Sequence, residues 1–430
     1  MIITELQQLY ATHPNVEGMC KLLKNDSVRH LYCSGLCASA ASLFSSVLVQ
    51  RAECPFVFIL GDLEEAGYFY HDLTQILGTG QVLFFPSSFR RAIKYGQKDA
   101  ANEILRTEVL SRLQKGEEGL CVVTYPDALA EKVVSRKELG DKTLKLHAGE
   151  KVDMDFVTEV LRSYGFEYVD YVYEPGQYAV RGSIIDVFSF SSEFPFRIDF
   201  FGDEVESIRT FEVESQLSRE KKEEIVIVPD LSRSLEQGGN GGMVSFLDFL
   251  RPDTLLAMRD FLWLRERIQA VHDESLTAQA IAACEAEENG AISLEGKLID
   301  GGEFTLRALD FRRMEFGTKP TGTPDATVAF STVAQPIFHK NFDLVAESFR
   351  DYLSRNYTLY ICSDSLKQTD RIRAIFEDRG DNISFTPVER TLHEGFADDT
   401  LRLCIFTDHQ LFDRFHKYNL KSDKARSGKV

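Results

Sequence analysis

Long apolar runs and a surplus of basic residues are both missing from this sequence. No apolar run reaches the roughly 18 residues of a membrane-spanning helix. The N-terminus, MIITELQQLY, also lacks the basic and apolar regions of a secretory signal peptide. With 49 Lys and Arg against 67 Asp and Glu, the formal net charge is -18, which disfavours a chain that grips a nucleic-acid backbone alone. We therefore expect a cytoplasmic protein with no membrane partner.

The eight cysteines offer neither a disulfide framework nor a metal site. Most of them lie inside apolar runs such as LCVVTY and LRLCIF, where a thiol behaves as a small hydrophobic group. This usage is typical of a reducing compartment. Cys33 and Cys37 are spaced C-x3-C, but no second Cys or His pair follows them, so we expect no bound metal.

Recognisable catalytic motifs are missing too. No H-E-x-x-H, G-x-S-x-G, EF-hand loop or acidic helicase-type box occurs, and the nine histidines are dispersed. A predicted strand at 30–34, then Gly35 and a small-residue helix, form the frame of a phosphate-binding loop. The tetrapeptide ASAA at 38–41 stands where that loop needs a second glycine, a lysine and a Ser or Thr. We interpret residues 35–42 as a structural turn; nucleotide binding there is the alternative.

The connection FFPSSFRRAIKYGQKD is a second candidate for nucleic-acid contact. Phe89 and Tyr95 lie among its four basic residues, which are Arg90, Arg91, Lys94 and Lys98. A basic and aromatic loop can meet DNA, and a solvated loop ahead of a helix has the same composition. The acidic balance of the chain favours the solvated loop.

The order of predicted elements divides the chain into regions. Its 430 residues suffice for about two to four domains. Strands and helices alternate over residues 1–140, which predicts a parallel, doubly wound sheet. The β-rich segment 141–229 predicts an α+β domain, and apolar helices and strands resume over 230–340. A last α/β unit is expected at 341–418, and the basic, polar residues 419–430 are typical of a linker to further chain.

Individual elements follow from hydrophobic periodicity. In the first region we predict strands at 30–34, 56–60, 82–85 and 120–125. In the last region we predict helices at 342–354, 366–378 and 410–416, and strands at 358–362, 383–387 and 401–407.

The densest β signal runs from Tyr171 to Phe211, where aromatic and β-branched residues alternate between turn signals. It predicts a three-stranded antiparallel meander. Gly182 would break the first strand as a bulge, and Gly202-Asp203 fits the two-residue loop of a hairpin.

Period-two alternation assigns the faces of the strand FRIDFF. Three apolar residues fall on the core side: Phe196, Ile198 and Phe200. Arg197, Asp199 and Phe201 fall on the other side, which fits either a partner-binding face or a solvated sheet face. Asp186 and Asp199 could approach each other across paired strands. With Arg197 beside them, we expect structural ion pairs instead of a catalytic pair.

The run EPGQYAVRGSIIDVF, followed by FRIDFFGDEVESIRTF, closely resembles a module shared by the bacterial transcription-repair coupling factors and excinuclease B. FFPSSFRRAIKYG and VVTYPDAL match the same module. The run HEGFADDTLRLCIFTDHQLFDR resembles the third domain of the coupling factors and not of excinuclease B. The chain is thus similar to the N-terminal half of a coupling factor.

The resemblance implies a fold: a degenerate helicase-like (RecA-type) parallel-sheet domain, split by an inserted α+β antiparallel-sheet domain, and a small C-terminal α/β domain. The expected bounds are 1–140 and 230–340 for the two parts of the split domain, 141–229 for the insertion, 341–418 for the small domain and 419–430 for the linker. Polymerase-binding and motor domains would follow beyond that linker.

The resemblance also implies a function, which is to recruit excinuclease A (UvrA) to a stalled RNA polymerase in transcription-coupled nucleotide excision repair. Family residues that meet excinuclease A carry over to Arg181, Arg197 and Phe201. ATP, magnesium, RNA polymerase and DNA would be bound only by the missing C-terminal domains, so this chain would have no cofactor and no catalytic residue. The alternative is an ATP-dependent nucleic-acid enzyme with an unrecognised site in this chain.

Overall fold

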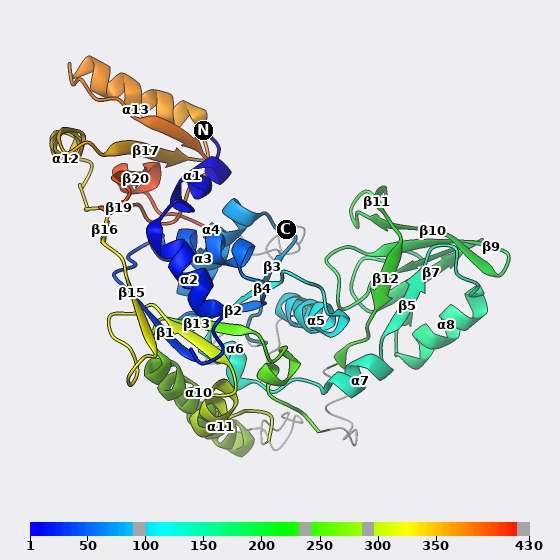
Figure 1. Cartoon of the computed structure of the whole chain (residues 1–430). Helices are drawn as coiled ribbons and strands as arrows, with labels where there is room; N and C mark the ends of the chain where they lie inside the picture. The colour runs from blue at the N-terminus through cyan, green and yellow to red at the C-terminus, as the bar shows by residue number, and fades with distance from the viewer. Residues whose placement is uncertain (89–99, 232–241, 286–295, 419–430) are drawn as a thin grey trace.

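The described residues form three large β-sheets, one parallel, one mainly antiparallel and one mixed, and a separate two-stranded pair (Figure 1). The computed structural model describes residues 1–88, 100–231, 242–285 and 296–418. In this part of the chain no helix combines the length and hydrophobicity needed to span a bilayer.

The largest sheet has seven parallel strands in the order β15-β1-β14-β13-β2-β4-β3. Its strands are β1 (His30–Ser34), β2 (Phe56–Ile59), β3 (Val82–Phe84), β4 (Cys121–Thr124), β13 (Leu255–Met258), β14 (Arg312–Glu315) and β15 (Ala326–Ala329). Short apolar strands such as FVFI, CVVT and LLAM are buried along their whole length, as expected for a parallel sheet covered on both faces. The predicted parallel sheet is confirmed, and its strands come from both sides of the β-rich segment.

Helices pack around this sheet (Figure 1). They are α1 (Ile3–Tyr10), α2 (Pro14–Leu23), α3 (Ala40–Arg51), α4 (Leu63–Leu77), α5 (Ala100–Lys115), α6 (Pro126–Ala130), α7 (Arg136–Asp141), the 3-10 helix η1 (Phe246–Phe249), α10 (Phe261–Glu285) and α11 (Gly301–Ala308). Several begin at a capping side chain: Asp62 accepts from the Glu65 N–H, and Asp300 from the Glu303 N–H.

The inserted unit stands to one side of the parallel sheet (Figure 1). Its six-stranded sheet has the order β11-β10-β9-β8-β7-β6, and a separate pair joins β5 to β12. The elements are β5 (Leu144–His147), α8 (Met154–Ser163), β6 (Glu167–Tyr168), β7 (Gln177–Arg181), β8 (Ile184–Val187), β9 (Phe196–Phe201), β10 (Glu204–Phe211), β11 (Ser218–Lys222) and β12 (Glu224–Ile227). Val157 and Leu161 of α8 pack on one face of the sheet against Ile185 and Ile198, in a core separate from that of the parallel sheet.

The predicted meander contains one more strand than expected. Arg181 pairs with Ile184, so Gly182 and Ser183 form a two-residue hairpin loop between β7 and β8. The bulge predicted at Gly182 is therefore wrong. Gly182 lies in the hairpin loop instead, where its φ of 58° allows the sharp reversal of the chain. The same type of loop at Gly202-Asp203 is confirmed, since Phe201 pairs with Glu204.

A five-stranded mixed sheet in the order β16-β19-β20-β17-β18 forms the third unit. Its strands are β16 (Thr332–Ala334), β17 (Thr358–Ser363), β18 (Thr386–Glu389), β19 (Phe396–Asp398) and β20 (Leu403–Thr407). The helices α12 (Phe342–Ser354) and α13 (Leu366–Asp378) have the predicted bounds and cover one face through Phe349 and Phe376. The opposite face continues the core of the parallel sheet through Tyr360 and Ile405.

Three local predictions for this unit are wrong. The prediction omitted the short strands β16 and β19. The strand predicted at 383–387 is β18, which begins only at Thr386. The helix predicted at 410–416 is α14 (Asp408–Leu411), which stops early. Asp413 has a φ of 51°, a left-handed value that cannot continue a right-handed helix.

A buried hydrogen bond joins the third unit to the N-terminal helix. The Tyr10 hydroxyl donates to Oδ2 of Asp398 at 2.9 Å, and both residues are fully buried. The other oxygen of Asp398 accepts from the backbone N–H groups of Thr400 and Leu401. Burial, together with the Asp398 carboxylate, raises the pKa of Tyr10 well above its usual value, so the phenol stays protonated as the donor.

Replacing Tyr10 with Phe removes this donor while keeping the ring. We expect the free energy of unfolding to fall by roughly 1–3 kcal/mol, because a buried carboxylate oxygen loses its partner. Urea unfolding followed by far-UV circular dichroism measures the change. The exposed Tyr173→Phe is the control and should change stability by less than about 0.5 kcal/mol. Equal effects of the two substitutions would contradict the role of the hydrogen bond.

Candidate partner-binding face

The strand register brings the three predicted site residues to one side of the inserted sheet. Residues directly opposite each other on paired strands share a face. Arg181 pairs with Ile184, which pairs with Asp199, and Asp186 pairs with Arg197 in the neighbouring row. We call this side, opposite to α8, the arginine face; its residues are Arg181, Ile184, Asp186, Arg197, Asp199, Phe201, Glu204, Ser207 and Arg209.

The buried carboxylate of Asp186 is the centre of the arginine face. Arg197 donates to it as a fork, with Nε 2.9 Å from Oδ1 and Nη2 3.1 Å from Oδ2. Arg181 donates through Nη2 to Oδ2 at 2.5 Å. Asp199 accepts separately from Nη2 of Arg209 at 3.1 Å. The predicted structural ion pairs are confirmed, and one carboxylate serves both predicted arginines.

Arg197 is largely enclosed, with only 14% of its side chain exposed. Besides its fork to Asp186, it donates through Nη1 to the carbonyl oxygen of Gln216 at 2.9 Å. Its guanidinium also lies 4.4 Å from the centre of the Phe211 ring. A side chain held on three sides in this way supports the face more than it presents itself to a partner.

Arg181 is more accessible, with 39% of its side chain exposed. Its Nη1 donates to the carbonyl oxygen of Asp170 at 2.9 Å, and the guanidinium lies 5.0 Å from the centre of the half-exposed Tyr171 ring. Arginine has five N–H donors, so some of them remain for an external carboxylate.

Phe201 is 76% exposed at the end of β9. It lies four residues from Arg197, about 14 Å along the strand. Near Arg197 the face is buried by a small hydrophobic cluster that includes Val172, Ala179 and Phe211. The exposed part of the face is therefore the end that carries Arg181 and Phe201. Phe201 on β9 and Arg181 on β7 lie on the same face with β8 between them. An exposed phenylalanine and a partly free guanidinium on one face suit an apolar pocket bordered by acidic groups on a partner.

Tyr171 and Gln216 were missed by the sequence analysis. Both lie outside the strands, so the alternation pattern says nothing about them. Their contacts with Arg181 and Arg197 arise where the chain folds back over the sheet.

The glycine loop after β1 has partners within the chain. A Cβ added at Gly35 would lie 2.0 Å from the carbonyl oxygen of Phe330, so the glycine allows a close approach of the chain after β15. The Cys37 N–H donates to Oγ1 of Thr332, and the Ser39 N–H donates to the carbonyl oxygen of Glu394. Backbone groups that would hold a phosphate therefore bind the third unit instead.

The side chains of this loop are also engaged. Ser39 and Ser42 each donate to Oδ2 of Asp72 at 2.7 Å, and burial raises the pKa of that carboxyl group. A cavity of about 250 Å³ adjoins them. Its lining includes one arginine, Arg259, and several acidic residues: Asp62, Glu64, Glu65, Asp72 and Glu394. Such a lining repels a polyphosphate.

The basic loop predicted as a possible DNA contact lies outside the described residues. Its members are Arg90, Arg91, Lys94 and Lys98.

Replacing Asp186 with Asn removes the charge shared by the two arginines and keeps the shape. We expect local stability to fall by roughly 3–5 kcal/mol, because the nearly buried Arg197 is left without a counter-charge. Native-state hydrogen exchange of the β8 and β9 amides measures this loss. Asp199→Asn, which breaks a more exposed pair with Arg209, should cost less than about 1 kcal/mol. Similar losses in the two variants would contradict the central role of Asp186.

Comparison with known proteins places the arginine face in a described domain. Residues 144–232 match the family described as "UvrB interaction domain". The chain is 29% identical to the transcription-repair-coupling factor of Escherichia coli (strain K12) over 196 residues, which are 45% of this chain and 17% of that protein. The corresponding protein of Bacillus subtilis (strain 168) is 27% identical over 238 residues, covering 53% of this chain and 20% of the relative.

A longer match extends these findings along the chain. The transcription-repair-coupling factor of Staphylococcus aureus (strain bovine RF122 / ET3-1) is 21% identical over 469 residues, covering 92% of this chain and 39% of the relative. The chain thus spans less than half the length of the curated relatives it matches. The resemblance found in the sequence motifs is confirmed: the chain is similar to the transcription-repair-coupling factors over most of its length, and residues 144–232 match the UvrB interaction domain.

Proposed function

We propose that this chain recruits excinuclease A through its arginine face and so links nucleotide excision repair to transcription. The observation that carries the proposal is that Phe201 and Arg181 are both exposed on the arginine face, within residues that match the UvrB interaction domain. The names of the relatives support the transcription-coupled context. In this proposal the complex forms in the cytoplasm.

The charges of the face define the partner surface. Asp186 offsets one of the two guanidiniums that contact it, so Arg181 and Arg197 together keep one net positive charge. Asp199 and Arg209 neutralise each other. Phe201 would enter an apolar pocket on excinuclease A, and Arg181 would bind a carboxylate at the edge of that pocket. Arg197 would act by holding Asp186, and through it Arg181, in place.

Replacing Phe201 with Ala should weaken binding of purified excinuclease A by at least roughly 30-fold, because an aromatic anchor is lost. Arg181→Ala should weaken binding by about 10-fold through loss of a charge-assisted contact. Isothermal titration calorimetry gives both affinities.

Phe156→Ala is the matched control for this experiment. Phe156 is a half-exposed phenylalanine of the same unit, on α8 and therefore behind the opposite side of the sheet. Its replacement should leave the affinity unchanged. Full affinity in both Phe201→Ala and Arg181→Ala, with native circular dichroism spectra, would refute the proposed face.

We also propose that the parallel sheet of this chain holds no nucleotide. The supporting observations are the loop N–H groups bound by Glu394 and Thr332 and the acidic lining of the neighbouring cavity. ATP-driven movement, magnesium, and contacts with RNA polymerase and DNA are assigned in this proposal to the parts of the relatives that this chain does not match.

This second proposal predicts that a fluorescent ATP analogue with magnesium shows no saturable binding to the chain and that ATP does not raise its melting temperature. The acidic cavity should exclude the triphosphate. Saturable binding that is lost in Ser42→Ala would show a functional phosphate site and would support the alternative of an ATP-dependent enzyme.

A further inference from the structure

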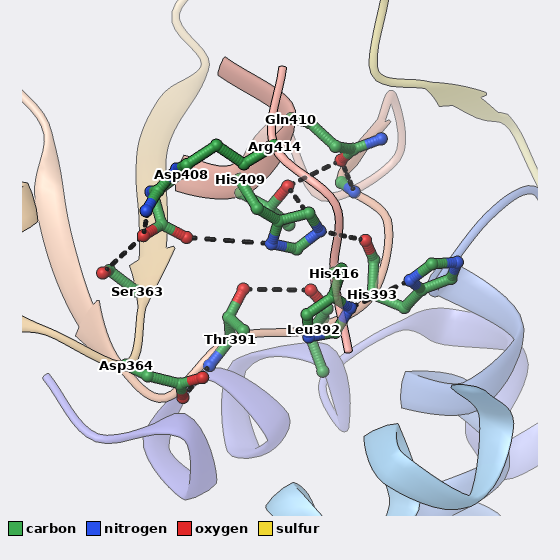
Figure 2. A network of polar contacts seen from close by, with 12 residues as sticks. Ser363, Asp364, Thr391, Leu392, His393, Asp408, His409, Gln410, Arg414 and His416 are labelled. Atoms are coloured by element: carbon green, nitrogen blue, oxygen red, sulfur yellow. Dashed lines mark hydrogen bonds and ion pairs between the residues drawn. The ribbon is translucent and has the colours of Figure 1, made fainter. Parts of the chain in front are cut away.

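Three histidines that are far apart in the sequence meet beside α4. His393 precedes β19, His409 lies in α14, and His416 lies in the chain after α14 (Figure 2). One ring nitrogen of each lies within 4.8 Å of the other two. We propose that His393, His409 and His416 bind a zinc ion that fastens the end of the third unit to the parallel-sheet unit.

The distances suit coordination after a small adjustment. Nδ1 of His393 lies 3.0 Å from Nδ1 of His416, and two nitrogens on a tetrahedral zinc ion are about 3.3 Å apart. The His409 ring is stacked on that of His416, with 4.1 Å between centres and 12° between planes. Lone pairs of parallel rings do not converge on one point. The His393 ring is also within 19° of parallel to the other two, so binding requires the three rings to turn toward a common point.

Carboxylates stand behind two of the three rings. Oε1 of Glu394 is 3.4 Å from Nε2 of His393, and Oδ1 of Asp408 is 3.8 Å from Nδ1 of His409. A metal-bound histidine commonly donates its other N–H to such a group, which fixes the ring and its tautomer. Coordination through Nδ1 of His393 and Nε2 of His409 leaves the opposite N–H aimed at each carboxylate.

The metal-free arrangement leaves a buried nitrogen unsatisfied. Nε2 of His409 lies 2.6 Å from the carbonyl oxygen of His393 and donates to it, so the other ring nitrogen, Nδ1, needs a partner of its own. Among the described residues, this Nδ1 has no hydrogen-bond partner, although His409 is buried. Zinc at Nε2 would move the proton to Nδ1, where Asp408 accepts it. The ion thus gives Nδ1 a partner, while the His393 carbonyl oxygen gives up the Nε2–H that it accepts in the metal-free arrangement.

The surroundings of His393 and His416 favour the neutral imidazole, which is the form that binds metals. Burial, followed by the neighbouring histidines, lowers the pKa of His393 to about 4 and that of His416 to about 3. Metal ions compete with protons for the same lone pairs, so little proton release opposes binding near neutral pH.

Contacts with α4 indicate what the ion would hold. The Tyr68 ring stacks on His393 with 3.5 Å between centres, and its hydroxyl donates to the carbonyl oxygen of His416 at 2.5 Å. His71, one turn further along α4, has its ring centre 4.8 Å from that of His416. Its buried Nε2 has no hydrogen-bond partner in the part of the chain that the structure describes. We assign the fourth coordination position to His71 or to water.

Zinc titration of the untagged, chelator-treated chain tests the proposal. Calorimetry should show one zinc ion per chain, and Co²⁺ in its place should give the visible absorption of a tetrahedral site. His416→Ala, at the accessible end of the cluster, should lower zinc affinity beyond the roughly 10–100-fold that outer contacts contribute, and Asp408→Asn should lower it within that range. Zinc should raise the melting temperature of the unsubstituted chain and leave that of His416→Ala unchanged.

His147→Ala is the control, because His147 lies exposed in the inserted unit. Unchanged affinity in this variant, together with the losses above, would support the site. Absence of stoichiometric zinc binding, or equal binding by the unsubstituted chain and the folded His416→Ala variant, would overturn the proposal. A loss in His71→Ala would identify the fourth ligand.

Discussion

The arginine face depends on one buried charge. A carboxylate without water must be compensated, and Asp186 is compensated twice, by a fork from Arg197 and by a single contact from Arg181. These bonds connect β8 to β9 and to β7. Arg197 also donates to the carbonyl oxygen of Gln216, which attaches the loop between β10 and β11 to the sheet. The inner arginine is thereby enclosed while the outer one stays accessible. The same interaction that stabilises the sheet thus decides which of the two guanidiniums is exposed.

The parallel-sheet unit shows how a helicase-like frame can be closed from within. The loop after β1 keeps the glycine that such a frame requires, but its N–H groups and serine hydroxyls bind Glu394, Thr332 and Asp72. The third unit supplies two of these partners and shares the hydrophobic core of the parallel sheet.

The sequence was informative where local patterns decide the structure. Hydrophobic periodicity predicted α12 and α13 to the residue, and the period-two pattern placed Phe201 outward on β9. It failed where a single backbone angle decides, as at Gly182 and Asp413. The convergence of two arginines on Asp186, and of three histidines beside α4, depends on strand register and on packing between distant segments. Neither leaves a local pattern in the sequence.

The pairing of β5 with β12 has a consequence for how the insertion is tolerated. Leu144 pairs with Ile227, so the chain enters and leaves the inserted unit through two adjacent strands. Because β5 and β12 are paired, the two ends of the inserted unit lie side by side, as the two ends of a short hairpin do. The surrounding parallel sheet therefore meets the same connection whatever unit follows the β5–β12 pair. The entropic cost of closing a loop grows only slowly with the length of the loop. The β5–β12 pair lowers this cost for the host sheet, because it already holds the two ends of the insertion together. An evolving host chain can therefore gain, lose or exchange a recognition unit at this point without refolding its own core.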